Sequence, residues 1–183
     1  MQSQQFIVSL LVNNHSGVLM RVSSLFSRRA FNIDSLTVGT TNDPDISRMT
    51  IVSWGDDRMK DQITKQLQKL HDVHKVQLMD SDKIVVRELM LVKVCLEKGM
   101  LPELMEAVNT YRANVVDLST SSMSIEITGE TPKLNAFLDF ISQYSIVEMA
   151  RTGPTAIGRS TYCLKDDEDN FTDEANEEVG EAN

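Results

Sequence analysis

The polar run NNHSG at residues 13–17 has the residue types in this chain that are best suited to binding a ligand. It separates an apolar segment at 6–12, which predicts a buried strand, from an amphipathic pattern that predicts a helix starting at Val18. The first N–H groups of a helix lack partners within the helix, and the helix dipole places partial positive charge around them. Gly17 has no side chain to keep a ligand away from the backbone. This junction therefore predicts a carboxylate site.

A free amino acid would suit this site if nearby acceptors also held its ammonium group. The side-chain oxygens of Asn14 and Asn32, or loop carbonyls, can accept such hydrogen bonds. Val18, Leu19 and Ile33 would then surround an apolar side chain. The expected ligand is accordingly valine, leucine or isoleucine.

A structural interpretation of the same residues remains open. Asn14 and Ser16 are residue types that cap helices, and Gly17 is a type that eases turns. Asn32 can simply terminate the helix. Spacing alone does not decide between these structural roles and ligand binding.

Motifs of the common enzyme classes are absent from the full sequence, which contains no GxSxG, GxxxxGK[ST] or HExxH and no cysteine beside an evident base. His71 and His74 stand three residues apart near the end of a predicted helix, without an apparent third metal ligand. Cys95 and Cys163 are far apart and form no CxxC pair, so they predict neither a disulfide framework nor a zinc site. We therefore expect no catalytic residue and no metal in this chain.

Charge is distributed unevenly along the 183 residues, whose net charge is −9. Nine of the 27 acidic residues follow Lys165 with no base among them, which leaves 18 acids against 18 bases elsewhere. A neutral body argues against nucleic-acid binding, and the acidic segment 166–183 is expected to be disordered. The apolar run 6–12 is too short to span a bilayer and no basic leader precedes it, so we expect a cytoplasmic protein without membrane contact.

Hydrophobic periodicity predicts the same order of elements twice. The first half runs from the strand at 6–12 through a helix, two strands joined by the turn-rich TNDPDIS, and a second helix to a strand at 73–79. The second half repeats this order after the polar stretch DSDK. We therefore predict an α+β protein of two ferredoxin-like βαββαβ domains, at 5–80 and 84–162, each with a four-stranded antiparallel sheet and helices on one face.

Two stretches of this sequence closely resemble the small regulatory subunits of acetohydroxyacid synthase (acetolactate synthase), a family with ACT domains. The first, NNHSGVLMRVSSLFSRRAFNIDSLTV, resembles that family's N-x-[PS]-G-V-L-x-R loop and its R-x-[FY]-N-I-[DE]-S-L segment. The second is VRELMLVKV, and the likeness continues through EMARTGPTAIGRS, so that it covers roughly residues 5–160. Ala30 departs from the family pattern, because glycine commonly precedes the aromatic residue there, which matters if that position has a positive φ.

The resemblance implies a homodimer, paired through its ACT domain, that binds the catalytic large subunit, activates it and makes it sensitive to valine or another branched-chain amino acid. It implies no cofactor in this chain, with thiamine diphosphate, Mg and FAD expected in the catalytic subunit. The effector positions implied by the motif lie on the first loop and at the start of the second strand, where they would meet across the dimer interface: Asn14, His15, Ser16, Gly17, Val18, Leu19, Asn32 and Ile33.

Two other functions remain as alternatives. The same amino-acid sensor can serve a different biosynthetic enzyme or a regulator, since ACT modules are widely reused. A small ferredoxin-like hydrolase, such as an acylphosphatase, would need a phosphate-binding loop with an arginine and a water-positioning asparagine, which Arg21 and Asn14 only loosely provide.

Overall fold

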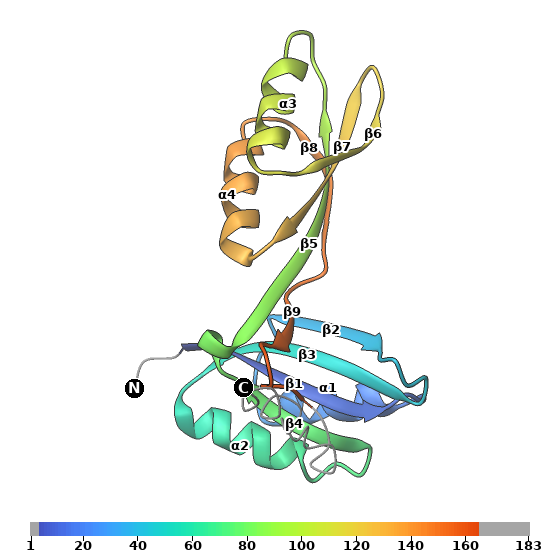
Figure 1. Ribbon diagram of the computed structural model, residues 1–183, viewed down its shortest axis with the longest axis vertical. Coiled ribbons are helices and arrows are strands. Elements are labelled where there is room, and N and C mark those ends of the chain that lie inside the picture. The colour runs from blue at the N-terminus through green and yellow to red at the C-terminus, as the bar shows by residue number, and fades with distance from the viewer. Residues whose placement is uncertain (1–3, 165–183) are drawn as a thin grey trace, which may run out of the picture.

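The computed structural model describes residues 4–164, which form two α+β halves stacked along the long axis of the molecule (Figure 1). The first half contains, in chain order, β1 (Gln4–Asn13), α1 (Val18–Arg28), β2 (Ser35–Thr40), β3 (Ile46–Gly55), α2 (Asp57–Leu67) and β4 (Val73–Met79). The second contains the 3-10 helix η1 (Ser81–Lys83), β5 (Ile84–Cys95), α3 (Leu101–Thr110), β6 (Asn114–Leu118), β7 (Ser122–Gly129), α4 (Thr131–Ile141), β8 (Ile146–Arg151) and β9 (Thr155–Gly158). The acidic segment 166–183, for which disorder was predicted, lies outside the described residues.

The two sheets have equivalent strand orders. The first is β2-β3-β1-β4 and the second is β6-β7-β5-β8, and every neighbouring pair is antiparallel. Two helices cover one face of each sheet, with α1 and α2 below the first sheet in Figure 1 and α3 and α4 to one side of the second. The predicted α+β fold, with two ferredoxin-like βαββαβ units, is confirmed.

Alternation along each strand decides which side chains meet the helices. In β1, Val8, Leu10 and Val12 are fully buried, together with Val22 of α1 and Ile63 of α2. The intervening residues of β1 point to the opposite face of the sheet. Helix periodicity and strand alternation therefore produce one core between the sheet and its two helices.

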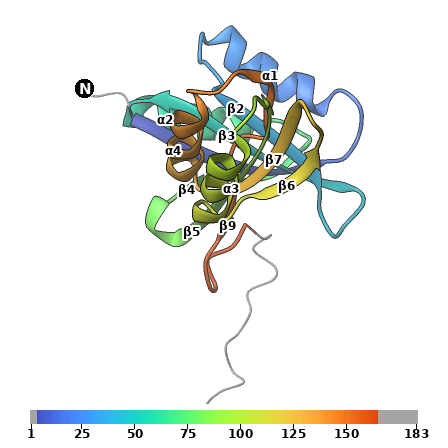
Figure 2. The same cartoon turned by 90° about the horizontal axis from the view of Figure 1, so that it is seen from above.

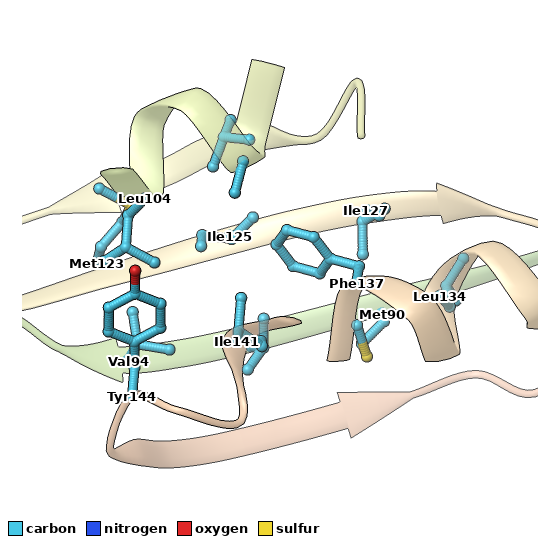
Figure 3. Close-up of a cluster of buried hydrophobic side chains, with 13 residues drawn as sticks. Met90, Val94, Leu104, Met123, Ile125, Ile127, Leu134, Phe137, Ile141 and Tyr144 are labelled. Carbon is cyan, nitrogen blue, oxygen red and sulfur yellow. The ribbon is translucent and has the colours of Figure 1, made fainter. Parts of the chain in front are cut away.

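The second core is built in the same way. Figure 3 shows side chains of α3 and α4 lying over those of β5 and β7, with the Phe137 ring among them. Tyr111 packs edge-on against this ring, with 5.2 Å between the ring centroids. The other large, fully buried side chains of this core are Met90, Leu104, Met123, Ile125, Ile127, Leu134 and Ile141.

The short strand β9 was not predicted from the sequence. β5 is 12 residues long, and its first part, Ile84 to Arg87, pairs with β9, whereas the part from Glu88 onward pairs with β7 and β8. In Figure 1, β9 lies directly above the first sheet, on the face opposite α1 and α2. After β8, the polypeptide thus leaves the second half and returns to the first sheet.

Contacts at this junction join the two halves. Thr37 Oγ1 of β2 donates to the carbonyl oxygens of Thr152 and Pro154, at 3.2 and 3.3 Å. Met79 of β4 is buried in a small apolar cluster with Ala156 of β9. The open face of the first sheet is therefore covered by the segment that follows β8.

The first helix of each half ends at a residue with left-handed backbone. Ala30 has a φ of 55° after α1, and Arg112 has a φ of 52° after α3. At the first of these ends, Phe31 N donates to Phe26 O at 3.0 Å, which satisfies a carbonyl of the last helical turn. Position 30 thus has the positive φ that favours glycine, and alanine is sterically strained there.

We predict that Ala30→Gly raises the free energy of unfolding by about 0.5–1 kcal/mol, because glycine adopts this conformation without alanine's steric cost. Ala136→Gly is the matched control: Ala136 is exposed within α4, so the same change should lower the free energy of unfolding by about 1 kcal/mol. Urea denaturation followed by circular dichroism measures both changes. A loss of stability in both variants would contradict the argument from strain.

Candidate functional site

The start of α1 has backbone N–H groups that no side chain caps. Gly17 precedes the helix with φ 89° and ψ −15°, and within residues 4–164 no side chain accepts a hydrogen bond from the first turn. Asn14 and Ser16 therefore do not cap α1, and the structural interpretation of these two residues is wrong. The first N–H groups of α1 are free to bind an anion.

Asn14 ties the loop before α1 to the turn between β2 and β3. Its Nδ2 donates to Pro44 O at 2.7 Å, and its backbone N donates to Asp45 O at 2.7 Å. Its Oδ1 accepts a hydrogen bond from Ser47 Oγ at 3.0 Å. An amide oxygen has two lone pairs, so this Oδ1 is held in place with one further acceptor position.

A buried carboxylate, which the sequence analysis did not identify, lies beside the start of α1. Asp72 is only 6% exposed, and its two oxygens lie 3.0 Å from Arg21 Nε and 3.1 Å from His15 Nε2. Arg21 also faces Gly17, since its Nη2 is 3.6 Å from the point where a Cβ on Gly17 would stand. A cation therefore stands at the uncapped helix start and adds to its attraction for an anion.

The other predicted residues lie at opposite ends of α1. Val18 is buried in the first core, whereas Leu19 is 45% exposed beside the loop. Asn32 and Ile33 follow the far end of the helix, where Asn32 is exposed and Ile33 packs against the core. Because α1 has 11 residues, its two ends are about 16 Å apart. One chain thus brings residues 14–19 together but leaves Asn32 and Ile33 away from them.

The second half repeats the glycine of this site without a counterpart of Arg21 on its helix. Gly99 precedes α3 with a φ of 89°, the value that Gly17 has before α1. No atom lies within 4 Å of the point where its Cβ would stand. α3 contains no arginine or lysine, so nothing on this helix corresponds to Arg21. The charged helix start is a property of the first half.

His71 and His74, which stand three residues apart in the sequence, both lie beyond the end of α2. α2 ends at Leu67, and His74 belongs to β4, where its Nε2 lies 2.6 Å from Asn13 Oδ1. In the part of the chain that the structure describes, no three His, Cys, Asp or Glu side chains are grouped to hold a metal ion. None of the helices in residues 4–164 is long and apolar enough to cross a membrane.

Comparisons with known proteins match both halves of the chain. The model for the AHAS small subunit-like ACT domain matches residues 8–75, and the model for the small subunit of acetolactate synthase matches residues 87–160. The probable acetolactate synthase small subunit of Methanothermobacter thermautotrophicus is 44% identical over 162 residues, which are 88% of this chain and 96% of that protein. The acetolactate synthase small subunit of Mycolicibacterium smegmatis is 49% identical over 152 residues, 83% of this chain and 89% of that protein. The crystal structure of the acetolactate synthase small subunit from Thermotoga maritima has a TM-score of 0.81 and 40% identity, over 86% of this chain and 98% of that chain.

We predict that Asp72→Asn lowers the free energy of unfolding by about 1–2 kcal/mol, because Arg21 and His15 lose the carboxylate that they face. Asp61→Asn is the matched control, since Asp61 pairs with Lys65 at 2.8 Å but its side chain is 61% exposed. Removing this exposed pair should cost at most about 0.5 kcal/mol. Urea denaturation of both variants measures the difference, and equal losses would refute a structural role for the Asp72 cluster.

Proposed function

Because this chain belongs to the family of acetolactate synthase small subunits, we propose that it is the regulatory subunit of that enzyme and has no catalytic residues of its own. Residues 5–80 then form the regulatory ACT domain, and residues 84–162 form an ACT-like second domain. The reaction takes place on a separate catalytic subunit, which holds the thiamine diphosphate, Mg and FAD. This chain activates that subunit and makes it sensitive to a branched-chain amino acid.

The uncapped start of α1 beside Arg21 is the observation that carries the sensing role. The effector's carboxylate accepts hydrogen bonds from the first N–H groups of α1, and Arg21 adds a positive charge nearby. The effector's ammonium donates to Asn14 Oδ1, which has one lone pair left. Leu19 offers exposed apolar surface to an aliphatic side chain. Valine satisfies all three requirements.

A second copy of this chain completes the site. Asn32 Nδ2 already donates to Asp34 Oδ1 at 2.7 Å, which leaves Asn32 Oδ1 as an acceptor at the far end of α1. A two-fold axis that sets two α1 helices antiparallel places Gly17 of one chain beside Asn32 of the other. Apolar surface on α1 supports such a contact, since Leu19 and Met20 are 45% and 67% exposed. The effector then bridges two chains and can change how they pair.

Only modest coupling is needed for feedback inhibition. Allosteric coupling is typically about 1–3 kcal/mol, which corresponds to a roughly 5–150-fold change in affinity. A few hydrogen bonds made in one dimer arrangement and lost in another supply energies of this size. Binding at the dimer interface is therefore sufficient to shift the subunit between activating and inhibiting arrangements.

We predict that Gly17→Asp abolishes inhibition by valine while activation of the catalytic subunit is retained. The new carboxylate lies within reach of Arg21 and occupies the place of the effector's carboxylate. Gly17→Asn is the matched neutral variant, because asparagine has the same shape and tolerates a positive φ but brings no charge, so it should weaken inhibition less. Titrating purified chain into the catalytic subunit, with and without valine, measures activation and inhibition separately.

The equivalent glycine of the second half provides a further control for that experiment. Gly99→Asp introduces the same charge at the same φ, but away from Arg21, and should leave valine inhibition unchanged. If the Gly17→Asp variant keeps its full sensitivity to valine, the proposed effector site is wrong. If the wild-type chain has no effect on the catalytic subunit, the regulatory role itself is wrong.

We predict that Gly17→Asp and Asn32→Ala each remove valine inhibition, and that mixing the two valine-insensitive variants restores it, because the site combines two chains. A dimer of one Gly17→Asp chain and one Asn32→Ala chain has one site with both changes and one site with neither. Random mixing makes half of all dimers of this kind, so about one site in four is intact. Valine inhibition of the refolded mixture measures this recovery, whereas a site formed within one chain would stay inactive in every dimer.

A further inference from the structure

Arg48 is a partly buried cation that has no acidic partner in the described part of the chain. It lies on β3, on the face of the first sheet opposite α1 and α2, and its Nη2 donates to Ala156 O of β9 at 2.8 Å. Its Nε is buried and has no hydrogen-bond partner among residues 4–164. Burial lowers the pKa of the Arg48 guanidinium from its ordinary value, yet arginine remains charged in proteins. A charge that is partly withdrawn from water is stabilised by a counter-charge, so Arg48 is suited to pair with an anion.

A groove of about 700 Å³ opens beside this guanidinium. The sheet contributes Leu11, Arg48 and His74 to its walls, and the segment after β9 contributes Leu164. Asp43 also lines the groove, but its Oδ1 accepts from the backbone N–H of its own turn, and no ion pair joins it to Arg48. The groove therefore has room for a small anion beside Arg48, with both polar and apolar side chains around it.

Other unsatisfied polar atoms lie on the same face of the sheet, one row away. Ser9 of β1 stands opposite Thr50 of β3 and Gln77 of β4, whereas Leu11 stands opposite Arg48 in the row beside it. Ser9 is fully buried, and within the described chain neither Ser9 Oγ nor Gln77 Oε1 has a hydrogen-bond partner. Rows of side chains on one face are about 7 Å apart along a strand. Ser35 Oγ of β2, which stands opposite Val52, is a further such atom, so four buried polar atoms without a hydrogen-bond partner among residues 4–164 lie on this face, which a purely structural packing surface would avoid.

We propose that the groove beside Arg48 binds a carboxylate. A guanidinium presents donors in a planar fork that matches a carboxylate, and such a pair would compensate the buried charge. A singly charged group fits better than a phosphate dianion, because Asp43 in the wall would repel a second negative charge. Leu11, Ile157 and Leu164 in the wall can contact a short aliphatic stem on this carboxylate.

Two sources can supply this carboxylate. One is a free aliphatic acid, and the other is the chain itself, since nine acidic side chains follow Leu164 and the first of them is Asp166. A tethered carboxylate reaches an effective concentration in the millimolar range, so it competes with a free acid of similar affinity. The chemistry at Arg48 is the same in both cases. This site is separate from the start of α1 and does not depend on the regulatory role proposed above.

The test uses the full-length chain without any catalytic subunit. Propanoate is titrated into ¹⁵N-labelled protein, with propanamide as the neutral probe, while the Nε–H resonance of Arg48 is followed. Propanoate should shift this resonance and propanamide should not. Arg48→Gln should abolish the accompanying backbone shifts of Leu11 and Ile157, whereas Arg87→Gln, a change at an exposed position of β5, should leave them unaltered.

Full-length chain in which the nine acids after Lys165 are changed to amides distinguishes the two sources. If the chain supplies the carboxylate, this variant binds propanoate about tenfold more tightly than the wild type. Equal affinities support a free acid. Arg48→Lys keeps the charge and should retain weaker binding, which guards against misfolding of Arg48→Gln. The proposal is overturned if neither form responds to propanoate, or if the response survives Arg48→Gln.

Discussion

A four-stranded sheet with helices on one face leaves its other face to be covered by something else. In the first half of this chain that face includes Ile7 and Met79, and leaving such side chains in water would forfeit their burial energy. The second half provides the cover. β5 runs beyond its own sheet to pair with β9, which lies against the first sheet, so the two halves share one structural unit at their junction. Figure 2, which looks along the stack, shows the second half lying over the first.

The same constraint connects the proposed effector contact to the second half. β2 begins three residues after Asn32. Thr37 of this strand donates hydrogen bonds to the carbonyl oxygens of Thr152 and Pro154. Asn32 itself is anchored to β3, since its carbonyl accepts from Ser53 Oγ at 2.6 Å. A short, hydrogen-bonded path therefore joins this strand end to the junction. Packed elements of this kind move as units rather than deforming gradually.

Repetition of the fold does not extend to its chemistry. Gly17 and Gly99 have the same positive φ, and Ala30 and Arg112 both adopt left-handed backbone after the first helix of their halves. These shared features are requirements of the βαββαβ chain path. The buried Asp72, with Arg21 and His15 against its two oxygens, lies beside the start of α1, and α3 has no arginine or lysine to form such a pair. Function on this fold thus depends on a few charges rather than on the path of the chain.

Local spacing in the sequence was sufficient to predict the helices, the principal strands and the residues of the loop before α1, because helix and strand periods are properties of neighbouring residues. It could not identify Asp72, which lies 57 residues from His15 in the chain and acts only where the fold brings the two together. Nor could it identify β9, since a strand of four residues has too few positions to display a period. The sequence also could not show whether Asn14 caps a helix or fixes a turn. That role depends on its hydrogen bonds to Ser47 and Pro44, about thirty residues away in the chain. Tertiary structure alone settled these points, because which charges pair and which sheet face is covered depends on distant segments meeting in space.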